Sequence, residues 1–188
     1  MLLRFGCVAL ALVLAGCQQE AAAPADQAQA PQLDAPAPAS EPSRVFAPQS
    51  DAARSATGAL TVAMTTRLPD DANGEITEVL TLTGANGLVV EATITGAVSP
   101  ATQVQGQTLR ALLDIAVEEP RTLVYRVTRE TKPEGVTQGI CGAEAPAFVV
   151  VWEPSGPGDP AMKVLGVMGE APGAAGSRAC PMLEYRRS

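Results

Sequence analysis

The stretch Leu88-Val89-Val90-Glu91-Ala92-Thr93-Ile94-Thr95 decides the fold class of this chain. From Leu88 to Ile94 every second side chain is apolar, while Glu91, Thr93 and Thr95 make the other face polar. This alternation is typical of a β-strand with one buried face. The preceding residues 84–87, Gly-Ala-Asn-Gly, have the composition of a tight turn, and residues 76–83 have similar strand chemistry. The two segments therefore predict an antiparallel hairpin.

Five further segments are short apolar or β-branched runs bounded by turn residues. With the hairpin they give seven predicted strands, at residues 60–66, 76–83, 88–95, 122–130, 147–153, 162–168 and 182–187. Short strands at this spacing predict a mainly β fold. We expect one antiparallel β-sandwich or open barrel with one short helix and one disulfide.

The helix is predicted at residues 108–116. Leu109, Leu112, Leu113 and Ala116 follow the i, i+3, i+4, i+7 spacing of an amphipathic helix, and Pro120 would end it. A strand over residues 111–117 is the alternative.

Residues 148–152, Phe-Val-Val-Val-Trp, have no polar face, so we expect this strand at the centre of the sheet with both faces covered. With the strands at 162–168 and 182–187 it is expected to form an up-down-up meander. The first and third strands then start at the same end, which brings Cys141 and Cys180 to one edge of the sheet.

The composition excludes several classes of protein. The 188 residues contain no histidine, which excludes Ser-His-Asp triads and zinc sites of the Cys2His2 type. A net charge of −7 argues against a nucleic-acid partner. Aromatic residues make up 3% of the chain, so the core is mainly aliphatic. Four aromatic side chains are expected to pack in that core rather than to stack on sugars: Tyr125, Phe148, Trp152 and Tyr185.

The amino terminus has the features of a secretory signal. Arg4 precedes an apolar run from Phe5 to Ala15 that is shorter than a membrane span. The run ends in Leu14-Ala15-Gly16-Cys17, which resembles the lipobox of bacterial lipoproteins at all four positions. The resemblance implies transfer of diacylglycerol to Cys17, cleavage before it and acylation of the new terminus. A plain signal peptide with a chance cysteine is the alternative.

The same resemblance implies a location. In the Gram-negative sorting rule for this family, an aspartate after the cysteine favours the inner membrane, and here Gln18 stands in that position. We therefore expect a lipid anchor in the outer membrane and a domain that faces the periplasm, with the cell surface as the alternative.

A tether is predicted to follow the anchor. In residues 18–50, 22 of 33 positions are Ala, Pro or Gln, a composition that cannot bury enough surface to offset the entropy of ordering. The predicted organisation is a signal peptide at 1–16, the lipidated cysteine and a disordered tether at 17–54, and a β-rich domain at 55–188.

The four cysteines reduce to one pair. Cys7 leaves with the signal peptide and the resemblance assigns Cys17 to lipid, so Cys141 and Cys180 remain. In an oxidising compartment such a pair predicts a structural disulfide. A redox or metal site is the alternative, but the Cys-x-x-Cys spacing is absent and two thiolates fill half a zinc shell. We expect no metal and no cofactor.

Catalytic chemistry has little support in the sequence. The acid pairs at 70–71 and 118–119 lie in turn-like contexts, and neighbouring side chains on a strand point to opposite faces. The sequence contains neither Gly-x-Ser-x-Gly nor Ser-x-x-Lys. These observations favour a non-catalytic protein, with an enzyme that works through carboxylates as an alternative.

A group of basic residues is the candidate ligand surface. Arg121, Arg126, Arg129 and Lys132 fall within 12 residues and could face an anionic envelope component. An outer face of salt bridges, balanced by the glutamates at 118, 119, 130 and 184, explains them equally well.

Two functions therefore remain. The first is a non-catalytic envelope lipoprotein whose β domain binds or supports another envelope component. The second is a proteinaceous inhibitor of a hydrolase such as lysozyme, because an acidic domain suits a basic target.

Overall fold

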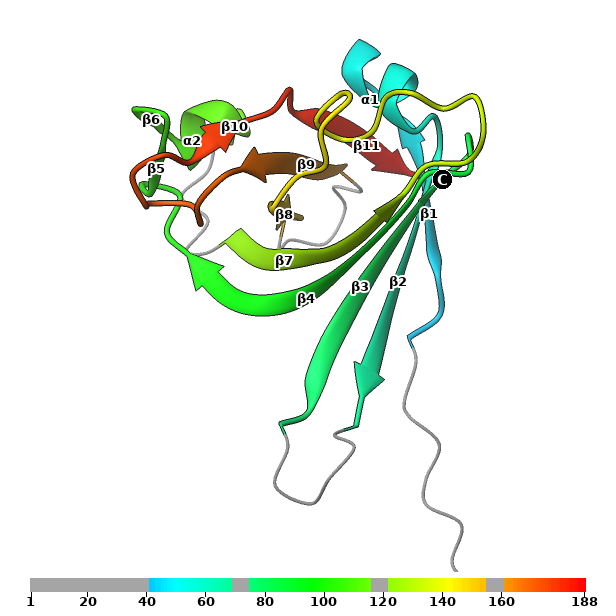
Figure 1. Ribbon diagram of the computed structural model, residues 1–188, viewed down its shortest axis with the longest axis horizontal. Coiled ribbons are helices and arrows are strands. Elements are labelled where there is room, and N and C mark those ends of the chain that lie inside the picture. The colour runs from blue at the N-terminus through cyan, green and yellow to red at the C-terminus, as the bar shows by residue number, and fades with distance from the viewer. Residues whose placement is uncertain (1–40, 69–74, 116–121, 155–160) are drawn as a thin grey trace, which may run out of the picture. The chain divides into compact units, whose positions relative to one another are not determined.

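Eight antiparallel strands close into a barrel in the computed structural model (Figure 1). The strands are β1 (Arg44–Pro48), β2 (Leu60–Arg67), β3 (Thr77–Gly84), β4 (Val89–Val98), β7 (Thr122–Thr131), β8 (Phe148–Trp152), β9 (Ala161–Met168) and β11 (Leu183–Arg187). Each pairs with the next along the chain, and the last pairs with the first, so this is an up-and-down barrel. The structure describes residues 41–68, 75–115, 122–154 and 161–188, all within a unit that extends from Ala37 to Ser188.

The predicted class is confirmed as mainly β and antiparallel, and all seven predicted strands are present within a few residues of the expected bounds. The architecture differs from a seven-stranded sandwich or open barrel, because an eighth strand closes the sheet. The hairpin of β3 and β4 is also confirmed. Its strands pair from Thr83 with Val89, and the amide of Gly84 donates to the carbonyl of Leu88 at 2.8 Å.

The eighth strand, β1, lies in the segment that the sequence assigned to the tether. It pairs with β2 through Phe46 and Leu60 and with β11 through Phe46 and Arg187. Phe46 is 1% exposed and belongs to the barrel core. The ordered domain therefore begins by residue 44, earlier than the expected boundary at 55. A sheet without β1 would leave two unpaired edges, and this strand removes both.

The remaining elements are short. They are α1 (Asp51–Ala56), α2 (Leu109–Leu112), β5 (Gln103–Val104), β6 (Gln107–Thr108) and β10 (Arg178–Ala179). Ser50 caps α1 and Thr108 caps α2, each accepting a hydrogen bond from a backbone amide of the first turn. The helix predicted at 108–116 is confirmed as a helix but ends at Leu112. Asp114 has a φ of 49°, which no helix continues through.

The barrel interior is one apolar cluster. Its members come from every strand of the barrel and from α1, and they include Phe46, Ala53, Leu60, Val62, Leu80, Leu82, Val90, Ala92, Tyr125, Ile140, Val149, Val151, Met162, Val164, Leu183 and Tyr185. Aliphatic side chains dominate, as the composition predicts. Alternate residues along each strand point inward, which is the pattern of a small barrel filled by its own side chains.

A second cluster covers the outer face of β7, β8 and β9. Leu109 and Leu113 of the α2 segment pack there with Phe148, Val150 and Leu165. Because Val149 and Val151 face the interior, every residue of β8 is buried. The expectation that both faces of this strand are covered is confirmed, although a closed barrel has no central strand. Tyr125, Phe148, Trp152 and Tyr185 are each at most 8% exposed, so the predicted burial of the aromatic residues is confirmed as well.

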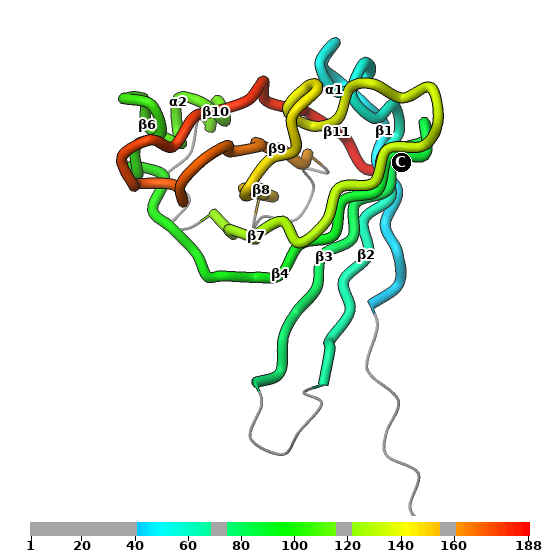
Figure 2. The backbone as a smooth tube through the Cα atoms, in the orientation of Figure 1, coloured from blue at the N-terminus to red at the C-terminus, as the bar shows by residue number. Residues whose placement is uncertain are grey.

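The hairpin of β2 and β3 extends beyond the rest of the barrel (Figure 2). These strands pair as far as Arg67 and Thr77, whereas β4 pairs with β3 from Val79 onward. Leu68 and Ile76 at the tip are 45% and 66% exposed. Among the residues described, no helix has the length and apolarity needed to cross a membrane.

Candidate functional site

The two ends of the barrel differ. At one end, here called the closed end, α1 and the connection at residues 133–147 contribute buried side chains, among them Ala53, Ala56 and Ile140, to the interior cluster. At the opposite end, here called the open end, β1 begins at Arg44 and β8 ends at Trp152. The cavity described below lies at the open end of the part of the barrel that the structure describes.

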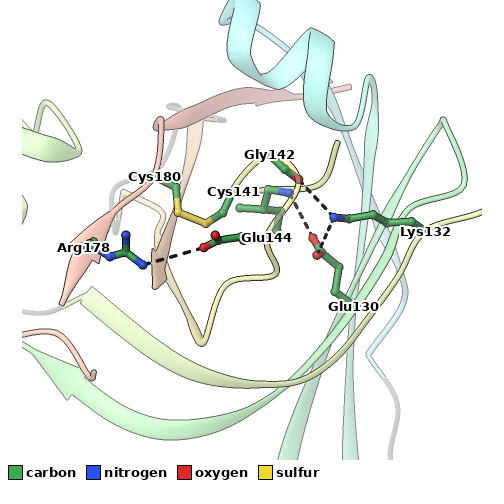
Figure 3. The surroundings of a disulfide bond; sticks show 8 residues. Glu130, Lys132, Cys141, Gly142, Glu144, Arg178 and Cys180 are labelled. Carbon is green, nitrogen blue, oxygen red and sulfur yellow. Dashed lines mark hydrogen bonds and ion pairs between the residues drawn. A yellow bond between two sulfur atoms is a disulfide. The ribbon is translucent and has the colours of Figure 1, made fainter. Parts of the chain in front are cut away.

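The disulfide between Cys141 and Cys180 secures the closed end, as the sequence predicts (Figure 3). The two Cα atoms are 5.2 Å apart, and the bond joins the 133–147 connection to the segment between β10 and β11. It packs over Gly166 of β9. A Cβ added there would meet Cys141 Sγ and would lie 2.9 Å from Ile140 Cγ2, so glycine makes room for the bond.

Polar contacts from β7 hold the same connection (Figure 3). The amide of Ile140 donates to Glu130 Oε1 at 3.2 Å, and Lys132 Nζ donates to the carbonyls of Gly142 and Ala143 at 3.2 and 2.7 Å. Lys132 Nζ also lies 3.5 Å from Glu130 Oε2. These bonds satisfy backbone groups of the connection and are structural in character.

The open end contains a pocket of about 340 Å³, which is within the range of small-molecule sites. Its lining combines polar and apolar surface in similar measure, and it comprises Glu41, Arg44, Val62, Met64, Leu80, Leu123, Tyr125, Val151, Trp152 and Glu153. Inward-facing residues of β2, β3 and β8 form the wall, while the charged residues come from β1, the segment before it and the end of β8. This pocket is the candidate functional site.

An ion pair crosses the pocket. Arg44 Nη1 lies 2.5 Å from Glu153 Oε2, and about a quarter to a third of each side chain is exposed. The hydrogen bond from Arg44 to Glu153 is the largest influence on the guanidinium, and it raises the pKa of Arg44 although burial opposes the shift. Arg44 also lies 5.5 Å from the centre of the Phe46 ring. The pair is therefore a fixed, mutually neutralised feature of the lining.

Tyr125 supplies a hydroxyl to the lining. Burial raises the pKa of Tyr125 to about 12, and the negative charges of Glu78, Glu153 and Glu41 add to that effect. Among the residues described, none forms a hydrogen bond with this hydroxyl. Tyr125 is therefore a neutral donor at ordinary pH, and it is available to a bound molecule.

Trp152 is part of the lining, although its side chain belongs to the outer cluster. Its side chain is buried, and its indole Nε1 has no hydrogen-bond partner within the described part of the chain. On the outer side of β8, the ammonium of Lys163 lies 5.7 Å from the ring centre. This nitrogen is fully covered by protein atoms, so it does not offer a hydrogen bond to a molecule in the pocket.

The basic residues of the candidate ligand surface do not line this pocket. Arg126 lies 4.8 Å from the centre of the Phe148 ring, and Arg129 pairs with Glu91 at 2.8 Å. Lys132 is committed to the closed-end connection. Arg121 and Cys17 lie outside the described residues. Each basic residue of this surface that the structure describes therefore has a partner within the chain, and Arg129 and Lys132 each pair with a glutamate.

The sequence offers little signal for the pocket. Arg44 stands in the segment read as a tether, and Glu153 follows a strand that was expected to be covered on both faces. Tyr125 and Trp152 were singled out, but as core residues. Only a closed barrel brings β1 and β8 together, since β9 and β11 separate them in the sheet.

No group of three or more metal-ligating side chains occurs in the described ranges. Comparisons with protein-family models, with curated proteins and with solved structures gave no match to this chain.

Proposed function

We propose that this chain is a non-catalytic binding protein of the bacterial envelope, and that it binds a small ligand in the open end of its barrel. The observation that carries the proposal is the pocket, in which apolar side chains surround the Tyr125 hydroxyl, a donor that makes no hydrogen bond with any described residue. Pockets of this composition bind small molecules through apolar contact and use a few polar groups for orientation.

The polar groups of the lining are suited to binding rather than to proton transfer. Arg44 and Glu153 neutralise one another. The Tyr125 hydroxyl keeps its proton until about pH 12, whereas a general base needs a pKa near the working pH. The lining therefore orients a ligand without reacting with it.

The proposed location is the outer membrane, through a lipid on Cys17. Its support is the resemblance of residues 14–17 to the lipobox. The position of the first described residue fits this arrangement, because Glu41 lies in the pocket lining. A chain that is anchored upstream of Glu41 would join the barrel at its open end.

Trp152 is the only tryptophan in the chain and it lines the pocket, so its fluorescence reports on occupancy. Native mass spectrometry of protein isolated from envelopes would show a co-purified small molecule, and its return to stripped protein should change the Trp152 emission. Val62→Phe fills the pocket and should abolish the response. Met64→Tyr fills the pocket nearer its mouth and provides a second test in case Val62→Phe does not fold.

Val45→Phe is the matched control, because Val45 is 47% exposed on β1. Binding that survives both pocket variants as well as it survives the control would contradict the proposed site. The anchor is tested separately, by the mass of the mature amino-terminal peptide. A peptide that begins at Cys17 without lipid would contradict the proposed attachment.

A further inference from the structure

The charges in the open-end pocket are unequal. Among the residues described, Glu41 and Glu153 line it together with one cation, Arg44, which is already bonded to Glu153 Oε2. Glu78 lies close enough to add to the negative potential at the Tyr125 hydroxyl. A positive group that enters this space meets a surplus of carboxylate, whereas a negative group meets a guanidinium that is already occupied.

The pocket also combines aromatic with aliphatic surface. Tyr125 and Trp152 contribute to the lining, and the rest of the wall includes Val62, Leu80 and Val151. Aromatic rings attract organic cations through the negative potential of their faces, and this attraction grows when the cation is shielded from water. The Trp152 ring packs in the outer cluster with the ammonium of Lys163 5.7 Å from its centre, so Tyr125 is the ring that faces the barrel interior.

We infer that the open-end pocket binds an organic cation with an apolar body, such as an alkylammonium compound. The apolar body would displace water from the aliphatic wall, and the ammonium group would lie beside the Tyr125 ring and the carboxylate of Glu41. The inference rests on the proposed function, because it names the ligand class of the same site. Cations with no apolar part should bind weakly, because the paired guanidinium of Arg44 reduces the electrostatic attraction that the pocket offers them.

Three probes that share an octyl chain but differ in the charge of the head group test the inference: octyltrimethylammonium, octyl sulfate and octyl glucoside. Each is titrated, below its micelle-forming concentration, into residues 37–188, which contain both core clusters and form one compact unit. Calorimetry and Trp152 emission report binding. We expect the cation to bind at least about tenfold more tightly than the sulfate, with a smaller difference at high salt because exposed charges are screened.

Two variants locate the preference. Glu41→Gln should weaken binding of the cation several-fold and leave the glucoside unchanged. Glu153→Gln should release Arg44 and shift the preference toward the sulfate. Glu170→Gln is the matched control, because it removes the same charge from an exposed residue in the turn after β9, at the far end of that strand from the pocket.

The outcomes separate the two proposals. If all three probes bind with similar affinity and the pocket-filling variant Val62→Phe abolishes binding, the pocket stands and the cation preference is wrong. If the sulfate binds most tightly, the inference is likewise overturned. If no probe binds, both the inference and the proposed use of the pocket are contradicted.

Discussion

Arg44 and Glu153 form a hydrogen-bonded ion pair that joins β1 to β8 across the open end of the barrel. The two strands are not neighbours, because β9 and β11 lie between them. The contact therefore does not follow from strand pairing. It brings two charged residues of the pocket lining together through a single bond between side chains.

The first prediction concerns the stability of this pair. Arg44→Met and Glu153→Gln should each destabilise the barrel by about 1 kcal/mol, and a double-mutant cycle should give a coupling energy of about 0.5–1 kcal/mol, because both side chains are partly exposed to water. Urea unfolding followed by circular dichroism measures these values. Strictly additive effects of the two substitutions would show that the pair does not act as a unit.

The second prediction concerns the disulfide. Replacing Cys141 and Cys180 together by alanine removes a crosslink between residues 39 apart, which on the chain-entropy model costs about 4 kcal/mol. The barrel should still fold, because both apolar clusters remain, but its unfolding midpoint in denaturant should fall. An unchanged midpoint, in the presence and absence of reductant, would show that the bond contributes nothing to stability.

Gly166 gives a third prediction that depends on the second. Gly166→Ala should cost about 1–3 kcal/mol, because the added Cβ meets Cys141 Sγ and Ile140 Cγ2 and the packed interior resists overfilling. In the variant that has alanine at both cysteines, the same substitution should cost less, since the sulfur atoms are gone. Equal costs in the two backgrounds would mean that the disulfide is not what excludes a side chain at this position.

The parts of the fold that the sequence predicts are those with a local pattern. The alternation from Leu88 to Ile94 and the turn before it specify the β3–β4 hairpin, and the uniform burial of residues 148–152 follows from their composition. The disulfide could be predicted because only two cysteines, Cys141 and Cys180, lie in the segment that was expected to fold. In each case the information needed for the prediction lies in a few neighbouring residues or in the number of cysteines.

The parts that the sequence does not predict depend on contacts between distant segments. β1 is a short strand in a segment rich in alanine, proline and glutamine, and only its pairing with β2 and β11 makes Phe46 a core residue. The pocket needs the same closure to bring Arg44 to Glu153. The helix at residues 108–116 ends early because Asp114 adopts a positive φ, a backbone conformation that the apolar spacing does not encode.

The fourth prediction is a pH dependence from the two tyrosines, the only ones in the chain. Burial is the main cause that raises the pKa of both Tyr125 and Tyr185 to about 12, from an unfolded value near 10. Between these values the unfolded chain loses protons that the folded chain keeps, so stability is full below about pH 10 and falls as pH rises toward about 12. Each tyrosine contributes a slope of about 1.4 kcal/mol per pH unit.

The absorbance of tyrosinate measures the ionisation of Tyr125 and Tyr185 directly, because no third tyrosine obscures the signal. The native protein should show no titration near pH 10, whereas protein in denaturant should titrate there. Tyr125→Phe and Tyr185→Phe should each reduce the loss of stability above pH 10. The Tyr185 variant should also lose the contact with the Thr57 hydroxyl, 2.7 Å away. A normal titration in the native state would contradict the burial of both hydroxyls.

The last prediction concerns the outer cluster, which covers the second face of β8. Leu109 is fully buried there, so Leu109→Ala should destabilise the protein by about 2–5 kcal/mol, through lost apolar burial and the cavity left behind. Leu68→Ala is the matched control, because Leu68 is 45% exposed at the tip of the β2–β3 hairpin and should change stability by less than about 0.5 kcal/mol. Both values come from urea unfolding. Since the outer cluster and the pocket share Trp152, the Leu109 variant should also shift the tryptophan emission toward that of a solvated indole. If the two leucine variants were equally stable, the α2 segment would be a loosely attached cover and not part of the core that holds β8 in place.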